Sequence, residues 1–90
     1  MKTIWKYTLE EEHTNRIMMP KGAIPISVQV QHKKICLWAI VESKNDLEDR
    51  FFFLATTGNP MIDNSLKMIF IGTVQLYGES IVCHIFEMTQ

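Results

Sequence analysis

The chain has 90 residues, of which 47% are apolar and 21% charged, and its nine basic residues nearly balance ten acidic ones. This length suits a single β-rich domain, residues 1–90, with one modest core, and the composition excludes a disordered chain. The charge balance excludes the basic stripe typical of nucleic-acid-binding proteins, and no apolar run reaches the roughly 20 residues that cross a bilayer. We therefore expect no nucleic-acid partner and no membrane association.

Alternating side chains predict a strand from Thr3 to Leu9 near the N-terminus. The charged connector Glu10 to His13 leads to a second short strand from Asn15 to Met19, which we expect to pair antiparallel with the first. Pro20 ends this second strand because proline has no N–H group to donate to a ladder.

The stretch from Ile24 to Val41 predicts a β-hairpin around which the rest of the chain is organised. Apolar and polar residues alternate from Ile24 to Gln31, so one face of this strand is expected to point into a core. The residues on that face are Ile24, Ile26, Val28 and Val30. His32 to Lys34 forms a polar break, and Ile35 to Val41 is apolar on both faces, as in a central strand that is covered on both sides.

The next segment alternates between polar and apolar stretches. Glu42 to Asp49 is strongly polar and predicts a surface loop, with room for one helical turn at Asn45 to Glu48. Phe51 to Ala55 predicts another strand that is apolar on both faces. Thr56 to Pro60 breaks it with turn residues, and Met61 to Lys67 suits a turn or a short helix.

Two long strands end the chain, from Met68 to Leu76 and from Ser80 to Met88, with a tight turn at Tyr77 to Glu79. Gly72 in mid-strand predicts a bulge or a sharp bend. The whole pattern predicts an all-β fold, a small antiparallel barrel or sandwich of about seven strands with at most one short helix.

The cysteine residues and the neighbouring histidine are more consistent with structural roles than with catalytic ones. Cys36 and Cys83 lie in apolar strands and no signal peptide precedes them, so we expect buried, reduced thiols and a cytoplasmic protein. Cys83 and His84 are adjacent in a strand, point to opposite faces and cannot easily form a thiol–imidazole pair. Because catalytic motifs and metal-ligand spacings are also missing from the sequence, we expect no enzyme, no metal and no cofactor.

One turn is the candidate ligand site. Two hydroxyls, a glycine and an asparagine follow an apolar strand there, and exposed N–H groups in such a turn can hold a small anion. The candidate ligand-binding residues are Thr56, Thr57, Gly58 and Asn59. A plain turn is the alternative interpretation.

Three aromatic residues, Trp38, Phe51 and Phe53, are the candidate interface residues. They lie on strands that are apolar on both faces, and a single-layered sheet in one small chain cannot cover both faces itself. Aromatic residues are also enriched in interface cores. We therefore expect a homodimer or higher oligomer, and the alternative is a sheet that closes tightly on itself.

Several blocks of sequence together resemble a family of short uncharacterised proteins from tailed bacteriophages and prophages. The blocks are Met1–Tyr7, Met19–Ala23, Ser27–Gln31, Cys36–Ala39 and Ile71–Leu76. The resemblance covers most of the chain and implies a phage origin but no particular activity. Members of that family often have Thr-Gly-His-Pro where this chain has Asn59 in place of the histidine, so a role for an imidazole there does not carry over.

These observations favour a small phage accessory protein in the host cytoplasm. We expect it to bind a host protein or a small ligand without catalysis, for example to inhibit a host defence or to sequester the ligand. The alternatives are a structural or assembly-associated phage protein and a hydrolase with a cryptic site.

Overall fold

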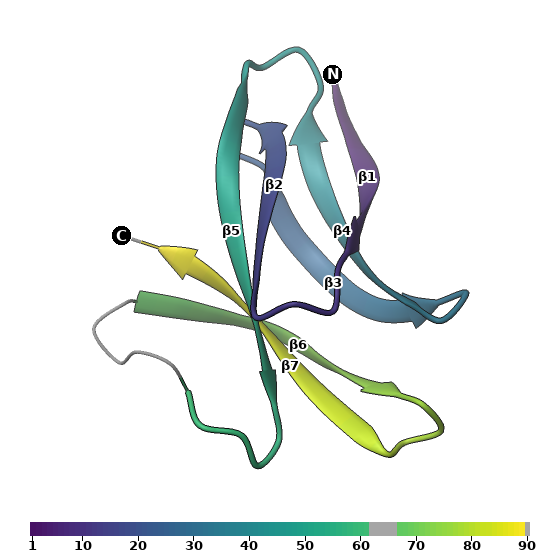
Figure 1. The fold of residues 1–90 in the computed structure, drawn as a ribbon. Helices are drawn as coiled ribbons and strands as arrows, with labels where there is room; N and C mark the ends of the chain where they lie inside the picture. Colours follow the sequence, from purple (N-terminus) through teal and green to yellow (C-terminus); the bar gives the residue numbers. More distant parts are fainter. Residues whose placement is uncertain (62–66, 90) are drawn as a thin grey trace.

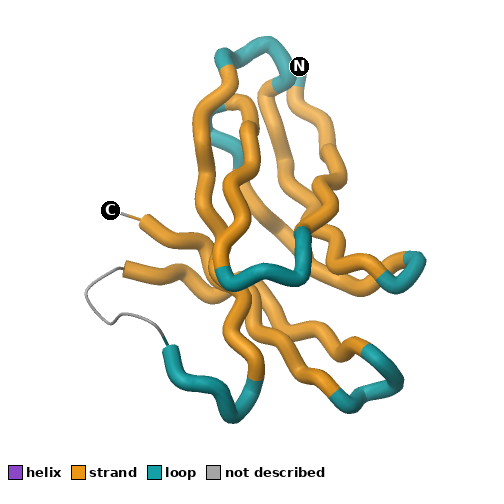
Figure 2. Tube along the Cα trace, viewed as in Figure 1, coloured by secondary structure: helices purple, strands orange, loops and turns teal. Residues whose placement is uncertain are grey.

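A computed structural model describes residues 1–61 and 67–89 of the chain, and within them seven strands form two antiparallel sheets (Figures 1 and 2). The strands are β1 (Lys2–Leu9), β2 (Thr14–Pro20), β3 (Ile24–Gln31), β4 (Lys34–Glu42), β5 (Leu47–Thr56), β6 (Lys67–Leu76) and β7 (Ile81–Thr89). The predicted all-β fold is confirmed, and it is an open sandwich instead of a closed barrel. None of the described residues belongs to a helix that could cross a bilayer.

Sheet A has the strand order β1-β4-β3, and sheet B has the order β2-β5-β7-β6. The inner faces of the two sheets pack against each other and form the core, as in other sandwiches. The largest fully buried side chains of this core are Phe52, Leu9, Met19, Ile35, Leu37 and Ile85. Both thiols are free and buried, as predicted.

The predicted hairpin is formed by β3 and β4, with β4 as the central strand of sheet A. Gln31 pairs with Lys34, so that His32 and Lys33 alone make the turn. Both of these residues have positive φ angles, 53° and 65°. This combination is the conformation of a type I′ turn, whose twist matches that of the flanking strands.

The expected pairing of the first two strands is wrong. β1 pairs with β4 in sheet A, whereas β2 pairs with β5 in sheet B. The connector between them turns the chain from one sheet to the other, and the side chain of Asn15 holds it in place. Its Oδ1 accepts a hydrogen bond from the Glu10 N–H (2.8 Å), and its Nδ2 donates to the Glu10 carbonyl (3.1 Å).

The expected core face of β3 is also wrong in part. Val28 is buried, but Ile24 and Ile26 are exposed, and Val30 is at the margin of the core. The register against β4 shifts between Pro25 and Ser27, which marks a bulge. A bulge adds one residue to one strand, so it reverses the faces on which the residues before it lie.

Half of the predicted loop from Glu42 to Asp49 is strand. β4 continues to Glu42 and β5 begins at Leu47, which leaves a turn at residues 43–46 and no helical turn at Asn45 to Glu48. Polar residues are compatible with strands here because this end of the sandwich faces solvent. The short helix that was expected after Met61 lies mainly outside the described residues.

The bulge predicted at Gly72 is confirmed by a register shift between Phe70 and Gly72 in the β6–β7 ladder. β3 and β6, which are edge strands of different sheets, approach each other closely at this point. A Cβ atom added to Gly72 would lie 2.7 Å from Cγ1 of Val28. The missing side chain therefore lets the edges of the two sheets meet.

Candidate functional site

The outer face of sheet B carries two rows of apolar side chains that run across its strands. In one row Met88 of β7 lies between Phe51 and Met68, and in the other Phe86 lies between Phe53 and Phe70. These residues alternate with the core residues of the same strands, so they point away from the core. We call this surface the aromatic face, formed by Phe51, Phe53, Phe70, Phe86, Met68 and Met88.

Two of the six side chains of the aromatic face are exposed to solvent, three are half-buried and one is buried. Phe70 is 57% exposed and Phe51 39%, whereas Phe53 is only 1% exposed. The rings of Phe70 and Phe86 meet edge to face, with centroids 5.5 Å apart, and His13 stacks on Phe53 at 6.3 Å. A partly exposed group of neighbouring aromatic and methionine side chains is typical of a protein-binding surface.

The predicted interface residues do not form one surface. Phe51 and Phe53 lie on the aromatic face, but Trp38 lies on the outer face of sheet A, where it is half-buried between Lys6 and Ser27. Sequence reasoning missed the contribution of β6 and β7. Their alternation places Phe70 and Phe86 on one face of each strand, but the pairing that unites them with β5 is not a local property.

Polar side chains border the aromatic face. At one margin Arg16 lies 3.9 Å from Asp49, and both are exposed. At the other margin, hydrogen bonds join His84 Nε2 to the Thr57 hydroxyl (2.7 Å) and His84 Nδ1 to the Thr73 hydroxyl (2.9 Å). An apolar centre with a polar rim is the usual anatomy of a protein interface.

The predicted ligand turn is part of this border. The Thr57 N–H donates to the Val82 carbonyl (2.9 Å), and the Asn59 N–H donates to the Thr56 carbonyl (3.0 Å). Gly58 has a φ of +91°, which explains the glycine at this position. Two N–H groups and one hydroxyl of the turn are thus already bonded within the protein, and its role in binding an anion stays a prediction.

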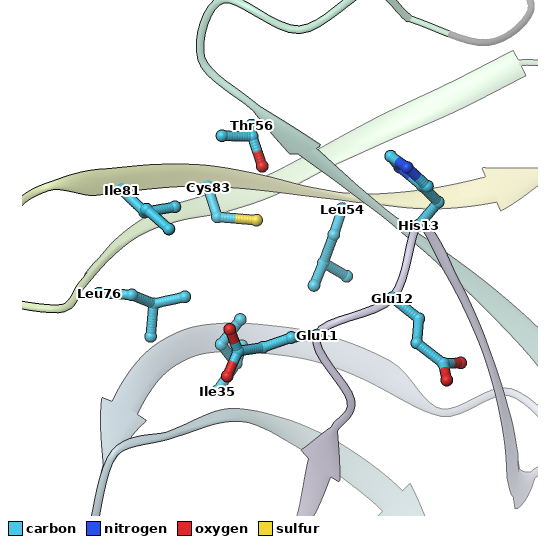
Figure 3. Close-up of a pocket in the computed structure, with 9 residues that line it drawn as sticks. All are labelled: Glu11, Glu12, His13, Ile35, Leu54, Thr56, Leu76, Ile81 and Cys83. Carbon is cyan, nitrogen blue, oxygen red and sulfur yellow. The ribbon is translucent and has the colours of Figure 1, made fainter.

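A pocket of about 170 Å³ opens at one end of the sandwich, between the two sheets (Figure 3). The connector between β1 and β2 closes one side of it. Its lining combines apolar and polar side chains. The residues that line it are Glu11, Glu12, His13, Ile35, Leu54, Thr56, Leu76, Ile81 and Cys83. Figure 3 shows the Cys83 thiol and the Glu11 carboxylate directed toward the centre of the pocket.

Two polar groups of this end pocket, Cys83 and Glu11, form hydrogen bonds within the protein. Burial raises the pKa of the Cys83 thiol, and a hydrogen bond with Thr56 offsets this effect only in part, so the thiol is neutral at physiological pH. A neutral thiol is a weak nucleophile. The Glu11 carboxylate accepts hydrogen bonds from the Tyr77 hydroxyl at 2.8 and 2.9 Å, which raises the pKa of Tyr77. As predicted, Cys83 and His84 face opposite sides of the sheet.

A charged pair, Arg50 and Glu87, lies between the two sheets, away from the end pocket. The Arg50 guanidinium donates two hydrogen bonds to the Glu87 carboxylate, one of them 2.9 Å long, and also approaches Glu48 at 3.5 Å. These bonds to Glu87 raise the pKa of Arg50. The nearby Tyr7 hydroxyl is buried without a hydrogen-bond partner among the described residues, and burial raises its pKa. The pair therefore links the side chains of β5 and β7 on the inner face of sheet B.

No metal site is found in residues 1–61 and 67–89. No group of three or more histidine, cysteine, aspartate or glutamate side chains is close enough there to hold an ion.

Comparison with known proteins identifies the family of the chain. It belongs to a family described as a domain of unknown function (DUF7352), which matches residues 1–90. No curated protein and no solved structure matches it. The expectation that the chain belongs to an uncharacterised family is thereby confirmed, whereas a phage origin stays a prediction.

Proposed function

We propose that this protein is a non-enzymatic binding protein that holds a partner protein on the aromatic face. The observation that carries this proposal is the pair of cross-strand rows on sheet B, with Phe51 and Phe70 exposed at its surface. Burial of one such side chain contributes about 1.5–3 kcal/mol, and a few aromatic side chains of this kind often dominate the free energy of binding at an interface.

The end pocket supports a function without catalysis. Its one thiol, Cys83, is neutral and buried, and the Glu11 carboxylate is engaged by Tyr77. Nucleophilic catalysis needs a thiolate or an adjacent base, and Cys83 faces away from its neighbour His84. A hydrolase with a cryptic site is therefore the weaker proposal.

The resemblance to phage proteins suggests what the partner is. We propose a phage origin, residence in the host cytoplasm and a host protein as the partner, for instance a component of a defence system. A structural or assembly-associated role in the virion is the alternative. Mass spectrometry of purified particles distinguishes the two, because an accessory protein is absent from the particles.

Site-specific photo-crosslinking tests the proposed surface. A photoreactive phenylalanine analogue at Phe70 is expected to capture one host protein, whereas the same analogue at Gln29, which is exposed on the outer face of sheet A, is not. Equal capture at both positions would show that contacts are unspecific and would contradict the proposal.

The captured protein, once purified, allows a quantitative test by calorimetry. Phe51→Ser together with Phe70→Ser is expected to weaken binding by at least about thirtyfold, because these are the two most exposed aromatic side chains of the proposed interface. Val30→Ser is the matched control, since it removes an exposed apolar side chain from sheet A. An unchanged Kd in the double variant would rule out the aromatic face.

A further inference from the structure

β1 is an end strand of sheet A and has an open edge. It pairs with β4 on one side, and Figure 1 shows it at the outer margin of the sheet, where no other strand of residues 1–61 and 67–89 pairs with it. Two of its large side chains are exposed, Ile4 (55%) on the outer face and Trp5 (39%) on the inner face. An edge strand with exposed apolar residues on both faces is a template for pairing with another strand.

The register of β1 shows which backbone groups are available at this edge. The Ser43 N–H donates to the Met1 carbonyl (3.2 Å), so these two residues form a hydrogen-bonded pair at the start of the β1–β4 ladder. In an antiparallel ladder every second residue of β1 then bonds to β4, and the residues between them point to the open edge. The residues whose backbone N–H and C=O groups point to the open edge are Lys2, Ile4, Lys6 and Thr8.

We propose that β1 pairs with β1 of a second copy of this chain. The two strands run antiparallel about a two-fold axis at Trp5, and the two three-stranded sheets join into one continuous sheet of six strands. Trp5 then lies opposite Trp5 of the second copy. This position is a pair without mutual hydrogen bonds, in which the Cα atoms are about 4.5 Å apart and aromatic side chains stabilise each other.

Repulsion between lysines and the length of β1 favour this register over the neighbouring registers. A two-fold axis places residues of the same face opposite each other, so the axis must pass through one residue of β1. An axis at Ile4 would bring Lys2 opposite Lys6, and an axis at Lys6 would bring two copies of Lys6 together. Like charges directly opposite each other destabilise a sheet.

The axis at Trp5 avoids both conflicts. It places Lys6 opposite Ile4 and Lys2 opposite Thr8, and it engages all four outward-pointing residues of each strand. Axes nearer the ends of β1 overlap fewer residues and form fewer hydrogen bonds. Lysines at the edge of a sheet usually prevent pairing with another strand. In β1 the spacing of the two lysines disfavours the neighbouring registers, but it is compatible with the register that has its axis at Trp5.

Such a dimer would present two aromatic faces to partners. The dimer edge lies on sheet A and the aromatic face on sheet B, so the two surfaces are separate. Dimer formation through β1 therefore does not depend on partner binding at the aromatic face.

Disulfide trapping tests the register in the full chain. Trp5→Cys is expected to form a covalent dimer on mild oxidation, because cysteines at the two-fold axis lie within the Cα separation that a disulfide spans. Ile4→Cys is the matched control. In the proposed register its two copies are offset by two residues, about 8 Å apart, which is too far for a bridge. The native thiols of Cys36 and Cys83 are buried and should not react.

Light scattering on the unmodified chain tests the dimer itself. At about 0.1 mM we expect the mass of two 10.5-kDa chains. Ile4→Pro removes an outward N–H from each strand without affecting the ladder to β4, and should weaken the dimer by about thirtyfold. A monomer in the unmodified chain, or equal trapping of Trp5→Cys and Ile4→Cys, would overturn the proposal.

Discussion

Gly72 shows how a single missing side chain determines the approach of two sheets. The edge strands β3 and β6 are in contact there, and Cγ1 of Val28 occupies the space that a Cβ atom would need. The φ angle of Gly72 is not in the left-handed region, so space and not backbone conformation requires glycine here.

We expect Gly72→Ala to lower the free energy of unfolding by about 1–3 kcal/mol, because the added methyl group overpacks the contact with Val28. Urea denaturation measures the change. Val28→Ala removes the opposing atoms, so the same substitution should be less destabilising in that background. Equal effects in both backgrounds would show that the contact is not the cause.

At the level of secondary-structure elements, the turn between β3 and β4 sets the register of the hairpin. His32 and Lys33 both adopt positive φ, a conformation that residues with a Cβ atom populate at a cost of about 1–2 kcal/mol each. The hairpin forms because the paired residues on β3 and β4 outweigh this strain.

Lys33→Gly should therefore stabilise the protein by about 0.5–1 kcal/mol, because glycine is the preferred residue at the second position of a type I′ turn. Thermal unfolding should show a higher Tm. Lys34→Gly is the control, since Lys34 already pairs with Gln31 in the ladder and glycine weakens a strand. A lower Tm for Lys33→Gly would contradict the assignment of the turn.

At the scale of the whole molecule, the sandwich buries two acidic groups in their neutral forms. The Cys83 thiol lies near one end of the core and the Tyr7 hydroxyl toward the other, and burial raises the pKa of both. A raised pKa in the folded state means that deprotonation favours the unfolded chain. The stabilising effect of these groups is complete below their ordinary pKa values, 9.0 for cysteine and 10.0 for tyrosine.

We therefore expect the Tm to fall as the pH rises above about 9, first through Cys83 and then through Tyr7. A series of thermal unfolding curves from neutral to alkaline pH measures this loss. Cys83→Val should lack the first part of the decline, because no thiol remains to titrate. A parallel decline in this variant would show that other groups cause it.

The sequence by itself determined which segments are strands and where most turns lie. Side-chain alternation has a period of two and is a local property, and the turn at residues 32–33 depends on its own backbone. The prediction of an all-β fold of about seven strands was therefore correct, as was the placement of Cys83 and His84 on opposite faces.

Only the tertiary structure decided which strands pair, and hence which surfaces exist. The connector held by Asn15 sends β2 to the other sheet, and the bulge in β3 turns Ile24 outward. Phe51 and Phe53 could be selected from the sequence, but the rows that they form with β6 and β7 could not. Pairing depends on contacts between segments far apart in the chain, and a one-residue shift of register moves a side chain to the opposite face.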